Sequence, residues 1–348
     1  MRDQLEQSER PTILDVAKYA RVAASSVSRV MNEHPDVSTA MRERVLAASE
    51  ALGYQPHFLA KSLRSGRTYS VGFVVRDISN PLFADIAKGA EDALRRAGYS
   101  MVLTNSEGDA ELDAEYVGFL RQRHVDALIL ALESESHLPT LEALALFRGP
   151  MVLLDREVKE VTASAVLCDH RSGVRDGVAH LLDLGHERVG FVAGPDTIRV
   201  TRERLSGYRE AHHDRQAAVY DELVRLGSYT RDFGHQQTLE LLRLVQPPTA
   251  ILAAGLQLVT GVLLALQERQ VRVGEDLALV CCDEVDLMRV FSPPLSAVTR
   301  DGYLLGETAA SLLVDMLTRG AAERVVHLPT RYVPRGTSVS PCGYTVKT

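Results

Sequence analysis

Short polar side chains near residues 24–31 are suited to hydrogen bonding with DNA bases. Ser25, Ser26 and Ser28 precede or flank Arg29 on the outward face of a predicted helix. A guanidinium can pair with O6 and N7 of guanine, whereas a short side chain makes one hydrogen bond or touches a thymine methyl group. A helix with such a face fits the DNA major groove. An ordinary packed helix pair gives the same local pattern, so the surrounding elements must separate the two interpretations.

Two short helices on either side of Arg21 would hold these side chains. Apolar residues repeat there at helical spacing, at Ile13, Val16, Ala17, Ala20, Val22, Val27 and Val30. Ala17 is small where the helices would cross, which suits a helix-turn-helix corner. Ser38 is a candidate N-cap for a third helix, and Gly53 is a candidate for its end. The amphipathic segment 57–66 that follows is too short to be stable alone.

Charge is divided unevenly along the chain. The 348 residues carry a formal net charge of −7, which alone argues against a nucleic-acid partner. Residues 12–67, however, hold eight Lys and Arg against five Asp and Glu, a net of +3, so the remainder sums to −10. A small basic unit on a large acidic body is expected when only the small unit approaches phosphate.

Composition argues against several other classes of protein. No apolar run reaches about 18 residues, the length that indicates a transmembrane helix. The polar stretch MRDQLEQSERPT is unlike a signal peptide. The four cysteines, at positions 168, 281, 282 and 342, have neither metal-ligand nor disulfide-framework spacing. We therefore expect a reduced, cytoplasmic protein with no metal, no cofactor and no membrane partner.

From Tyr69 onward, short apolar runs alternate with amphipathic helices. The strand-like runs are 71–75, 100–105, 127–132, 151–155, 165–169, 188–194, 249–255 and 278–283. Helical segments such as 85–98, 175–185 and 261–270 lie between them. This alternation favours parallel sheets that are covered on both faces. Roughly 270 residues exceed one small sheet, so we expect two α/β lobes with a cleft between them.

Polar residues follow the predicted strands, at the positions where open α/β sheets bind ligands. These positions are Asp77–Phe83, Asn105, Glu133–Ser134, Asp155–Arg156, Asp169–His170, Asp196–Arg204, Gly255–Leu256 and Asp283–Asp286. Their acids and arginines are suited to a polar small molecule such as a sugar, a nucleoside or a phosphorylated metabolite. Each of these residues alone is interpreted as a solvated charge in a loop. Only their joint placement on the rim of one cleft would distinguish a ligand-binding site from such loop charges.

The chain resembles the lactose/galactose repressor family of bacterial transcription factors over about residues 12–338. The matching motifs include TILDVAKYA…VSRVMN, DVSTAMRERVLAASEALGYQP, LAKSLRSGRT, DISNPLFADIAKGAEDA, HLLDLGHERVGFVAGP and PPLSAVTR. Each motif is weak alone, but their order and spacing are typical of the family. The resemblance implies an N-terminal all-α helix-turn-helix head and a hinge helix. An α/β core of two lobes with parallel sheets would follow, like that of periplasmic binding proteins.

The resemblance also implies a domain order and partners. We expect a flexible tail at 1–11, a DNA-binding head at 12–56, a hinge helix and linker at 57–67, a two-lobed core at 68–338 and a C-terminal tail at 339–348. The N-lobe would comprise about 70–168 plus 299–327, and the C-lobe about 169–296 plus 328–338. A homodimer would bind a pseudo-palindromic operator in double-stranded DNA, and a small-molecule effector in the cleft would control it.

Positions that match the family's motifs supply the candidate site residues. The resemblance implies base contacts from Ala24, Ser25 and Arg29, and phosphate contacts from Thr12, Ser26, Ser28, Asn32 and Arg42. In the hinge, Leu63 would wedge into the minor groove beside Ala60 and Arg64. Effector contacts would come from Asn80, Phe83, Asp155, Arg156, Arg204 and Asp283.

The chain departs from the family's pattern at several positions. Arg21 stands where the turn usually has Gly, and a positive φ there would cost roughly 1 kcal/mol or more. Ala23 replaces the usual capping Ser, and Met41 replaces a Thr that would add a phosphate donor. In the cleft, Gly255–Leu256 replaces an Asn-Asp pair that holds ligand hydroxyls. This change favours a less hydroxylated or anionic effector, and loss of small-molecule control is the open alternative.

Two other classes of protein compete with this interpretation. A two-lobed solute-binding protein shares the core, but it needs a secretion signal and has no basic head. An enzyme needs a nucleophile–base pair, a metal cluster or a glycine-rich phosphate loop, and none stands out in the sequence. The C-terminal stretch VPRGTSVSPCGYTVKT has no leucine heptads of the kind that join dimers into tetramers, so a dimer is expected.

Overall fold

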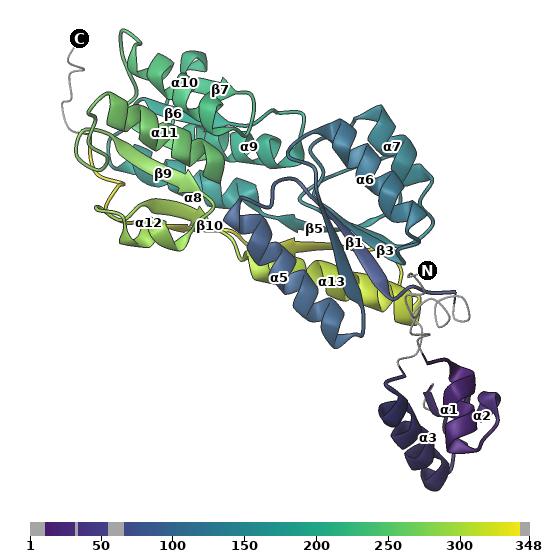
Figure 1. The fold of residues 1–348 in the computed structure, drawn as a ribbon. Helices are drawn as coiled ribbons and strands as arrows, with labels where there is room; N and C mark the ends of the chain where they lie inside the picture. The colour runs from purple at the N-terminus through teal and green to yellow at the C-terminus, as the bar shows by residue number, and fades with distance from the viewer. Residues whose placement is uncertain (1–10, 32–33, 55–65, 342–348) are drawn as a thin grey trace, which may run out of the picture. The chain divides into compact units, whose positions relative to one another are not determined.

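The chain folds as two compact units, which we call the head and the core (Figure 1). The computed structural model describes residues 11–31, 34–54 and 66–341. The head ends at Thr68 and the core begins at Tyr69. The predicted fold class, a helix-turn-helix head followed by a two-lobed α/β core, is confirmed.

The head is built from the helices α1 (Ile13–Ala20), α2 (Ala24–Met31) and α3 (Thr39–Leu52). A capping box starts α1, since the Asp15 carboxylate accepts a hydrogen bond from the Thr12 backbone N–H at 2.8 Å. Helix α3 begins after its N-cap Ser38 and ends at Gly53 in the left-handed region, as predicted. The three helices enclose a small apolar core of Val16, Ala17, Ala20, Val27, Val30, Val45 and Ala48.

Arg21 connects α1 to α2 in the left-handed region, with φ 54° and ψ 48°. The cost expected for a positive φ at this position therefore applies. A side chain in this region is disfavoured by contact of Cβ with the backbone, by roughly 1 kcal/mol, and glycine avoids that contact.

Replacing Arg21 with Gly should therefore stabilise the head by about 1 kcal/mol. Hydrogen exchange of the buried amides of α1 to α3 in the full chain would measure the change. Arg44→Gly, at an exposed site inside α3, is the matched control and should destabilise the head by about 1 kcal/mol. Faster exchange in Arg21→Gly would contradict the strain assigned to this turn.

The first lobe of the core, the N-lobe, contains a sheet of strand order β11-β5-β4-β3-β1-β2, with neighbouring strands parallel. Its strands are β1 (Ser70–Val75), β2 (Ser100–Asn105), β3 (Ala127–Leu130), β4 (Met151–Leu154), β5 (Ser164–Cys168) and β11 (Val325–Leu328). One face is covered by α5 (Pro81–Arg96) and α13 (Gly302–Arg319). The other is covered by α6 (Ala110–Gln122) and α7 (Leu138–Ala145) (Figure 1).

The second lobe, the C-lobe, contains a sheet of order β12-β10-β9-β8-β6-β7, in which β12 is antiparallel to β10 and the other pairs are parallel. Its strands are β6 (Val189–Ala193), β7 (Val224–Leu226), β8 (Ala250–Ala254), β9 (Ala278–Cys282), β10 (Ser296–Thr299) and β12 (Arg331–Val333). Helices α8 (His170–Asp183) and α9 (Arg199–Asp214) cover one face. The other face packs against α10 (Arg231–Leu242), α11 (Leu256–Glu268) and α12 (Asp286–Val290), and the 3-10 helix η1 (Asp221–Leu223) precedes β7.

Helices on both faces explain why the central strands are continuous apolar runs. In β6, Phe191 packs into the core on one face of the sheet and Val192 into the core on the other. The chain crosses between the two sheets after Cys168, Thr299 and Leu328. These crossings bring strands that lie far apart in sequence into one lobe.

The strands β7, β10, β11 and β12 are absent from the predicted set. Three of them, β7, β11 and β12, lie at sheet edges and are only partly buried, and β10 contains Ser296 and Thr299. A short or half-exposed strand has no continuous apolar run, which is the signal that identified the others. Their omission therefore follows from their position in the sheets.

Asp113 on α6 is a buried carboxyl whose Oδ2 accepts a hydrogen bond from the Glu133 backbone N–H at 2.7 Å. Burial raises the pKa of Asp113 to about 6. Because this folded pKa lies above the unfolded value near 3.9, the ionised form is disfavoured in the fold. The stability of the core is therefore unaffected by this group below pH 4 and declines as the pH rises through about 6.

Replacing Asp113 with Asn should stabilise the core at pH 7.5 by up to about 3 kcal/mol, because the pKa of Asp113 is raised from about 3.9 in the unfolded chain to about 6 in the fold. At pH 4 the same change should have little effect. Urea unfolding of the full chain at both pH values measures this difference. Asp109→Asn, which preserves the N-cap of α6, is the control and should be nearly neutral at both. A destabilised Asp113→Asn at pH 7.5 would refute the assignment.

Candidate functional site

The outward face of α2 carries the candidate base contacts. Ser25 and Arg29 are exposed, whereas Ala24 is half-buried against the core of the head. The Nη2 atom of Arg29 lies 3.5 Å from the Asp36 carboxylate, and both side chains are exposed. An exposed ion pair contributes about 0–1 kcal/mol, so the guanidinium can leave Asp36 for a base edge at little cost.

The candidate phosphate contacts differ in how far their polar groups are already engaged. Thr12 donates its hydroxyl to Asp15 at 2.7 Å, which commits this group to the capping box of α1. Arg42 makes a longer hydrogen bond, from Nη2 to the His34 carbonyl at 3.4 Å. Four candidate DNA contacts lie outside the residues that the structure describes: Asn32, Ala60, Leu63 and Arg64.

Helix α2 begins without a side-chain cap. The Ala23 carbonyl accepts from the Ser26 N–H at 2.9 Å, but the Ala23 side chain offers no oxygen. Ser26 and Ser28 are half-buried. Sequence reasoning missed Tyr19 on α1, which is 61% exposed and carries a hydroxyl that can donate to phosphate. The available signal was an aromatic residue on the polar face of the predicted first helix.

A cavity of about 70 Å³ lies in the core, and residues of both lobes line it. Its lining includes all six candidate effector residues, Asn80, Phe83, Asp155, Arg156, Arg204 and Asp283. Gly255 and Leu256, which follow β8 and begin α11, also line it. The structure therefore brings these strand ends to one cavity, whereas three others that the sequence placed at the cleft are not in its lining: Asn105, Glu133–Ser134 and Asp169–His170.

Sequence reasoning missed several further residues that line this cavity, among them Arg76, Tyr229, Gln257 and Arg300. Arg76 directly follows β1, one position before the stretch that was considered. Tyr229 and Arg300 follow β7 and β10, two strands that were not predicted. The signal for Arg300 was present in the motif PPLSAVTR, but its position beside the two aspartates depends on pairing of β10 with β9.

A buried chain of charges crosses the cavity through Arg300. Its Nη1 contacts Asp155 of the N-lobe, and its Nε donates to Asp283 of the C-lobe at 2.7 Å. Arg204 donates to the same Asp283 carboxylate at 3.2 Å and to the Ala254 carbonyl at 2.8 Å. Arg300 therefore links the two lobes through opposite charges that are shielded from water.

The arginines keep both carboxylates ionised. Burial opposes ionisation, yet His170 and Arg300 hold the pKa of Asp155 well below its usual value. Arg300 and Arg204 lower the pKa of Asp283 in the same way, also against the effect of burial. Burial lowers the pKa of His170 to about 4, although Asp155 opposes this shift, so the ring is neutral at pH 7.

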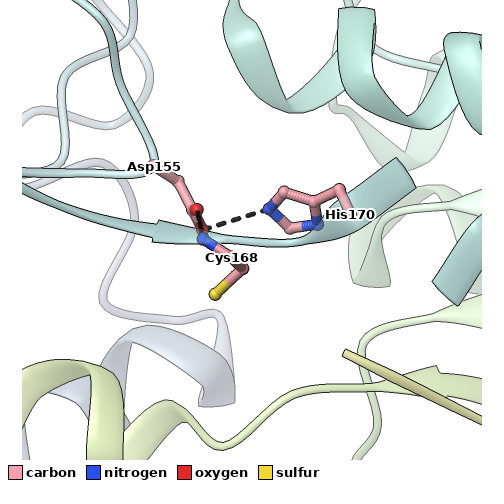
Figure 2. A group of neighbouring side chains, drawn as sticks. All are labelled: Asp155, Cys168 and His170. Atoms are coloured by element: carbon pink, nitrogen blue, oxygen red, sulfur yellow. Dashed lines mark hydrogen bonds and ion pairs between the residues drawn. The ribbon is translucent and has the colours of Figure 1, made fainter. Parts of the chain in front are cut away.

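Asp155, Cys168 and His170 place three potential metal ligands close together (Figure 2). The Asp155 carboxylate accepts from the Cys168 backbone N–H at 2.6 Å and lies 3.2 Å from Nε2 of His170. The group does not suit a metal ion, because Arg300 already supplies a cation to Asp155. Burial also raises the pKa of the Cys168 thiol to about 12, which disfavours the thiolate that a metal requires. The contacts within this cluster instead connect the end of β4 to the end of β5.

Glu135 joins the lobes at a second place, outside the lining of the cavity. This N-lobe residue is 7% exposed, and its Oε1 accepts from the backbone N–H of Arg199, the first residue of α9, at 2.9 Å. Its Oε2 accepts from Arg202 at 2.8 Å. Helix α9 has no side-chain cap of its own, and a carboxylate is favoured at a helix N-terminus. We call this arrangement the interlobe cap.

A helix-turn-helix head and a two-lobed α/β core with a cavity between its lobes define a class of DNA-binding regulators. Residues 12–57 match the family model "Bacterial regulatory proteins, lacI family", and residues 178–338 match "Periplasmic binding protein-like domain". With the relatives described next, these matches show that the chain belongs to the lacI family of bacterial regulatory proteins, a non-enzymatic family.

The relatives match along nearly the whole chain. Catabolite control protein A of Priestia megaterium is 30% identical over 92% of this chain and 97% of its own length. The ribose operon repressor of Halalkalibacterium halodurans is 31% identical over 94% of this chain and 97% of its own length. The lac repressor dimer bound to operator and the anti-inducer ONPF matches with a TM-score of 0.84 and 28% identity, covering 95% of this chain and 100% of that chain. The complex of the transcriptional regulator CelR with cellobiose matches with a TM-score of 0.71 and 31% identity, covering 94% of this chain and 100% of that chain.

These findings identify a transcriptional repressor with a DNA-binding head and an effector-binding domain. Among the described helices, none is long and apolar enough to cross a membrane.

Proposed function

We propose that this repressor acts in the cytoplasm as a homodimer on a pseudo-palindromic operator, under the control of a small molecule in the interlobe cavity. The observation that carries the DNA half is the outward face of α2, where Ser25 and Arg29 are exposed. The lac repressor, a dimer bound to operator, supports the assembly by similarity. The DNA-binding part of the head, at 12–56, would read the operator, and the hinge at 57–67 would enter the minor groove through Leu63.

The head divides its contacts into two kinds. Arg29 reads a guanine, and Ser25 and Ala24 make shorter contacts beside it. Ser26, Ser28, Asn32 and Arg42 hold phosphates and set the register of the helix on the duplex. Thr12 joins them when its hydroxyl leaves Asp15 for a phosphate. The weak Arg29–Asp36 pair keeps the guanidinium near α2 until a base replaces the carboxylate.

Arg29→Ala should cost about 1–3 kcal/mol at one base pair per half-site and should relax specificity there. Fluorescence anisotropy with operator duplexes that differ at single base pairs would measure the loss. Arg44→Ala, an exposed arginine on α3, is the control and should leave the sequence preference unchanged. An equal loss on all duplexes with Arg29→Ala would show that Arg29 contacts only phosphate.

The core supplies the control. An effector that contacts Asn80, Phe83 and Arg156 of the N-lobe together with Arg204 and Asp283 of the C-lobe binds one relative lobe position better than another. Its differential affinity shifts the equilibrium between these positions, with a coupling free energy of about 1–3 kcal/mol between cavity and DNA. The titration of operator affinity with effector measures this coupling.

A further inference from the structure

We propose that the effector is a small carboxylate with one negative charge and an apolar body. This inference rests on the proposed control through the interlobe cavity. It is argued from the walls of the cavity, from its hydrogen-bonding groups and from its charge balance.

The walls of the cavity are largely apolar. Both lobes contribute to them, through residues such as Leu82, Phe83, Leu154, Ile198 and Leu256. At Gly255, an added Cβ would lie 2.8 Å from the ring of Tyr229, so this position has no room for a polar side chain while the ring stays in place. Gly255 and Leu256, the two residues after β8, therefore give the ligand an apolar contact at a place where ligand hydroxyls would need polar side chains.

The carboxylates that line the cavity already accept hydrogen bonds from donors of the protein. Asp155 accepts from the Cys168 N–H on one oxygen and contacts Arg300 with the other. Asp283 accepts from Arg300 and from Arg204. A sugar hydroxyl needs an acceptor for its proton, and at these two carboxylates it would compete with the arginines that already donate to them. The two carboxylates therefore favour a polyol less than unpaired carboxylates would.

A buried donor in the same wall has no partner. Within the described part of the chain, Nε of Arg204 makes no hydrogen bond, although the side chain lines the cavity and is 2% exposed. A buried N–H without an acceptor is costly, and a charged donor prefers an anionic acceptor. The Arg204 guanidinium that lines the cavity therefore favours an anionic neighbour.

The charged side chains that line the cavity carry a net positive charge. Four arginines line it, Arg76, Arg156, Arg204 and Arg300, against two carboxylates, those of Asp155 and Asp283. Glu133, outside the lining, pairs with Arg76. His170 is neutral at pH 7. Asp77 lies outside the lining, where its carboxylate accepts from Ser79. Because an uncompensated buried charge is unfavourable, a ligand with a single negative charge is preferred over a neutral one.

Binding to the full-length protein tests this inference. Butyrate, hexanoate and benzoate, each beside its primary amide, together with ribose and glucose, would be compared by thermal shift and titration calorimetry. The volume of the cavity is about half of the roughly 150 Å³ that admits benzene. The three acids therefore differ in size, so that the largest acid that the cavity admits can be identified. At least one acid should bind about tenfold tighter than its amide, with a raised Tm. Equal binding of acid and amide, binding of a sugar alone, or no binding of any acid would overturn the inference.

A pair of variants at one position separates the effect of ligand charge on binding from the effect of cavity shape. Leu256→Asp adds a negative charge at the first turn of α11, where the helix dipole tolerates it, and Leu256→Asn adds the same volume without charge. The Asp variant should bind the acid at least about tenfold more weakly than the Asn variant. Arg215→Gln, an exposed site at the far end of α9, is the charge-matched control and should bind as the wild type does. Equal weakening by Asp and Asn would refute the role of charge.

Operator binding would be measured on the same preparations. Sequence-specific DNA binding without acid binding overturns the effector class and leaves the repressor assignment intact. Acid binding without sequence-specific DNA binding overturns the proposed function and leaves the class of ligand intact.

Discussion

Replacing Arg300 with Met should lower the free energy of unfolding of the core by about 3–5 kcal/mol at pH 7. Met keeps much of the volume but removes the cation that Asp155 and Asp283 share. Each carboxylate would then keep a weaker set of partners at a site with little access to water. The loss is large because a buried charge left unpaired costs more than the pair itself contributes.

The pH dependence of this loss has a definite sign. Asp155 and Asp283 have depressed pKa values in the wild type, so the stability they draw from Arg300 is present above the unfolded pKa near 3.9. Without Arg300 these pKa values rise, and protonation relieves the variant as the pH falls. The deficit should therefore be full at pH 7 and shrink toward pH 4.

Urea unfolding of the full chain at several pH values measures both effects. Arg215→Gln is the matched control, because Arg215 holds Asp183 through two hydrogen bonds of 2.7 Å at an exposed site. This exposed pair should contribute no more than about 1 kcal/mol. A loss in Arg300→Met as small as that of the control, or one independent of pH, would contradict the role assigned to the buried charges.

Replacing Glu135 with Ala should cost about 2–3 kcal/mol and should loosen one lobe against the other. The change leaves the backbone N–H groups of Arg199 and Glu157 without their acceptor and frees the Arg202 guanidinium. The first turn of α9 has no other side-chain cap, so its amides should exchange faster with solvent. The interlobe cap thus predicts that a substitution in the N-lobe, at Glu135, speeds hydrogen exchange in the C-lobe, at the start of α9.

Hydrogen exchange of α9 combined with urea unfolding would detect this coupling. Glu135→Gln is the matched control, because it keeps an oxygen for the two backbone donors and loses only the charge toward Arg202. Its cost should be about 1 kcal/mol, with little change in exchange of α9. Unchanged exchange of α9 in Glu135→Ala would show that the interlobe cap does not hold the helix.

The central strands and the ends of the head's helices could be predicted because their signals are local. β6 lies between two helical layers, so every residue from Val189 to Ala193 is apolar or Gly. Ser38 and Gly53 mark helix ends through backbone and side-chain chemistry that acts within one turn. These features need no knowledge of distant partners.

The parts of the cavity that were missed depend on pairing between distant segments. Arg300 reaches Asp155 only because β10 joins the C-lobe sheet and the chain then returns to the N-lobe. Glu135 caps a helix that begins at Arg199 in the other lobe, and no spacing in the sequence reveals this contact. The aspartates were found because they directly follow strong strands, whereas their arginine partner follows a weak one.

Selection of DNA from a random pool by the full-length protein at physiological salt tests the central claim most directly. The proposed function predicts enrichment of an inverted repeat whose half-sites are about one helical turn apart, because two heads of a homodimer would each place α2 in a major groove. Arg29→Ala should enrich the same repeat with one position per half-site relaxed. Recovery of unrelated duplexes, bound no better than scrambled DNA, would contradict the claim that this protein is a sequence-specific repressor.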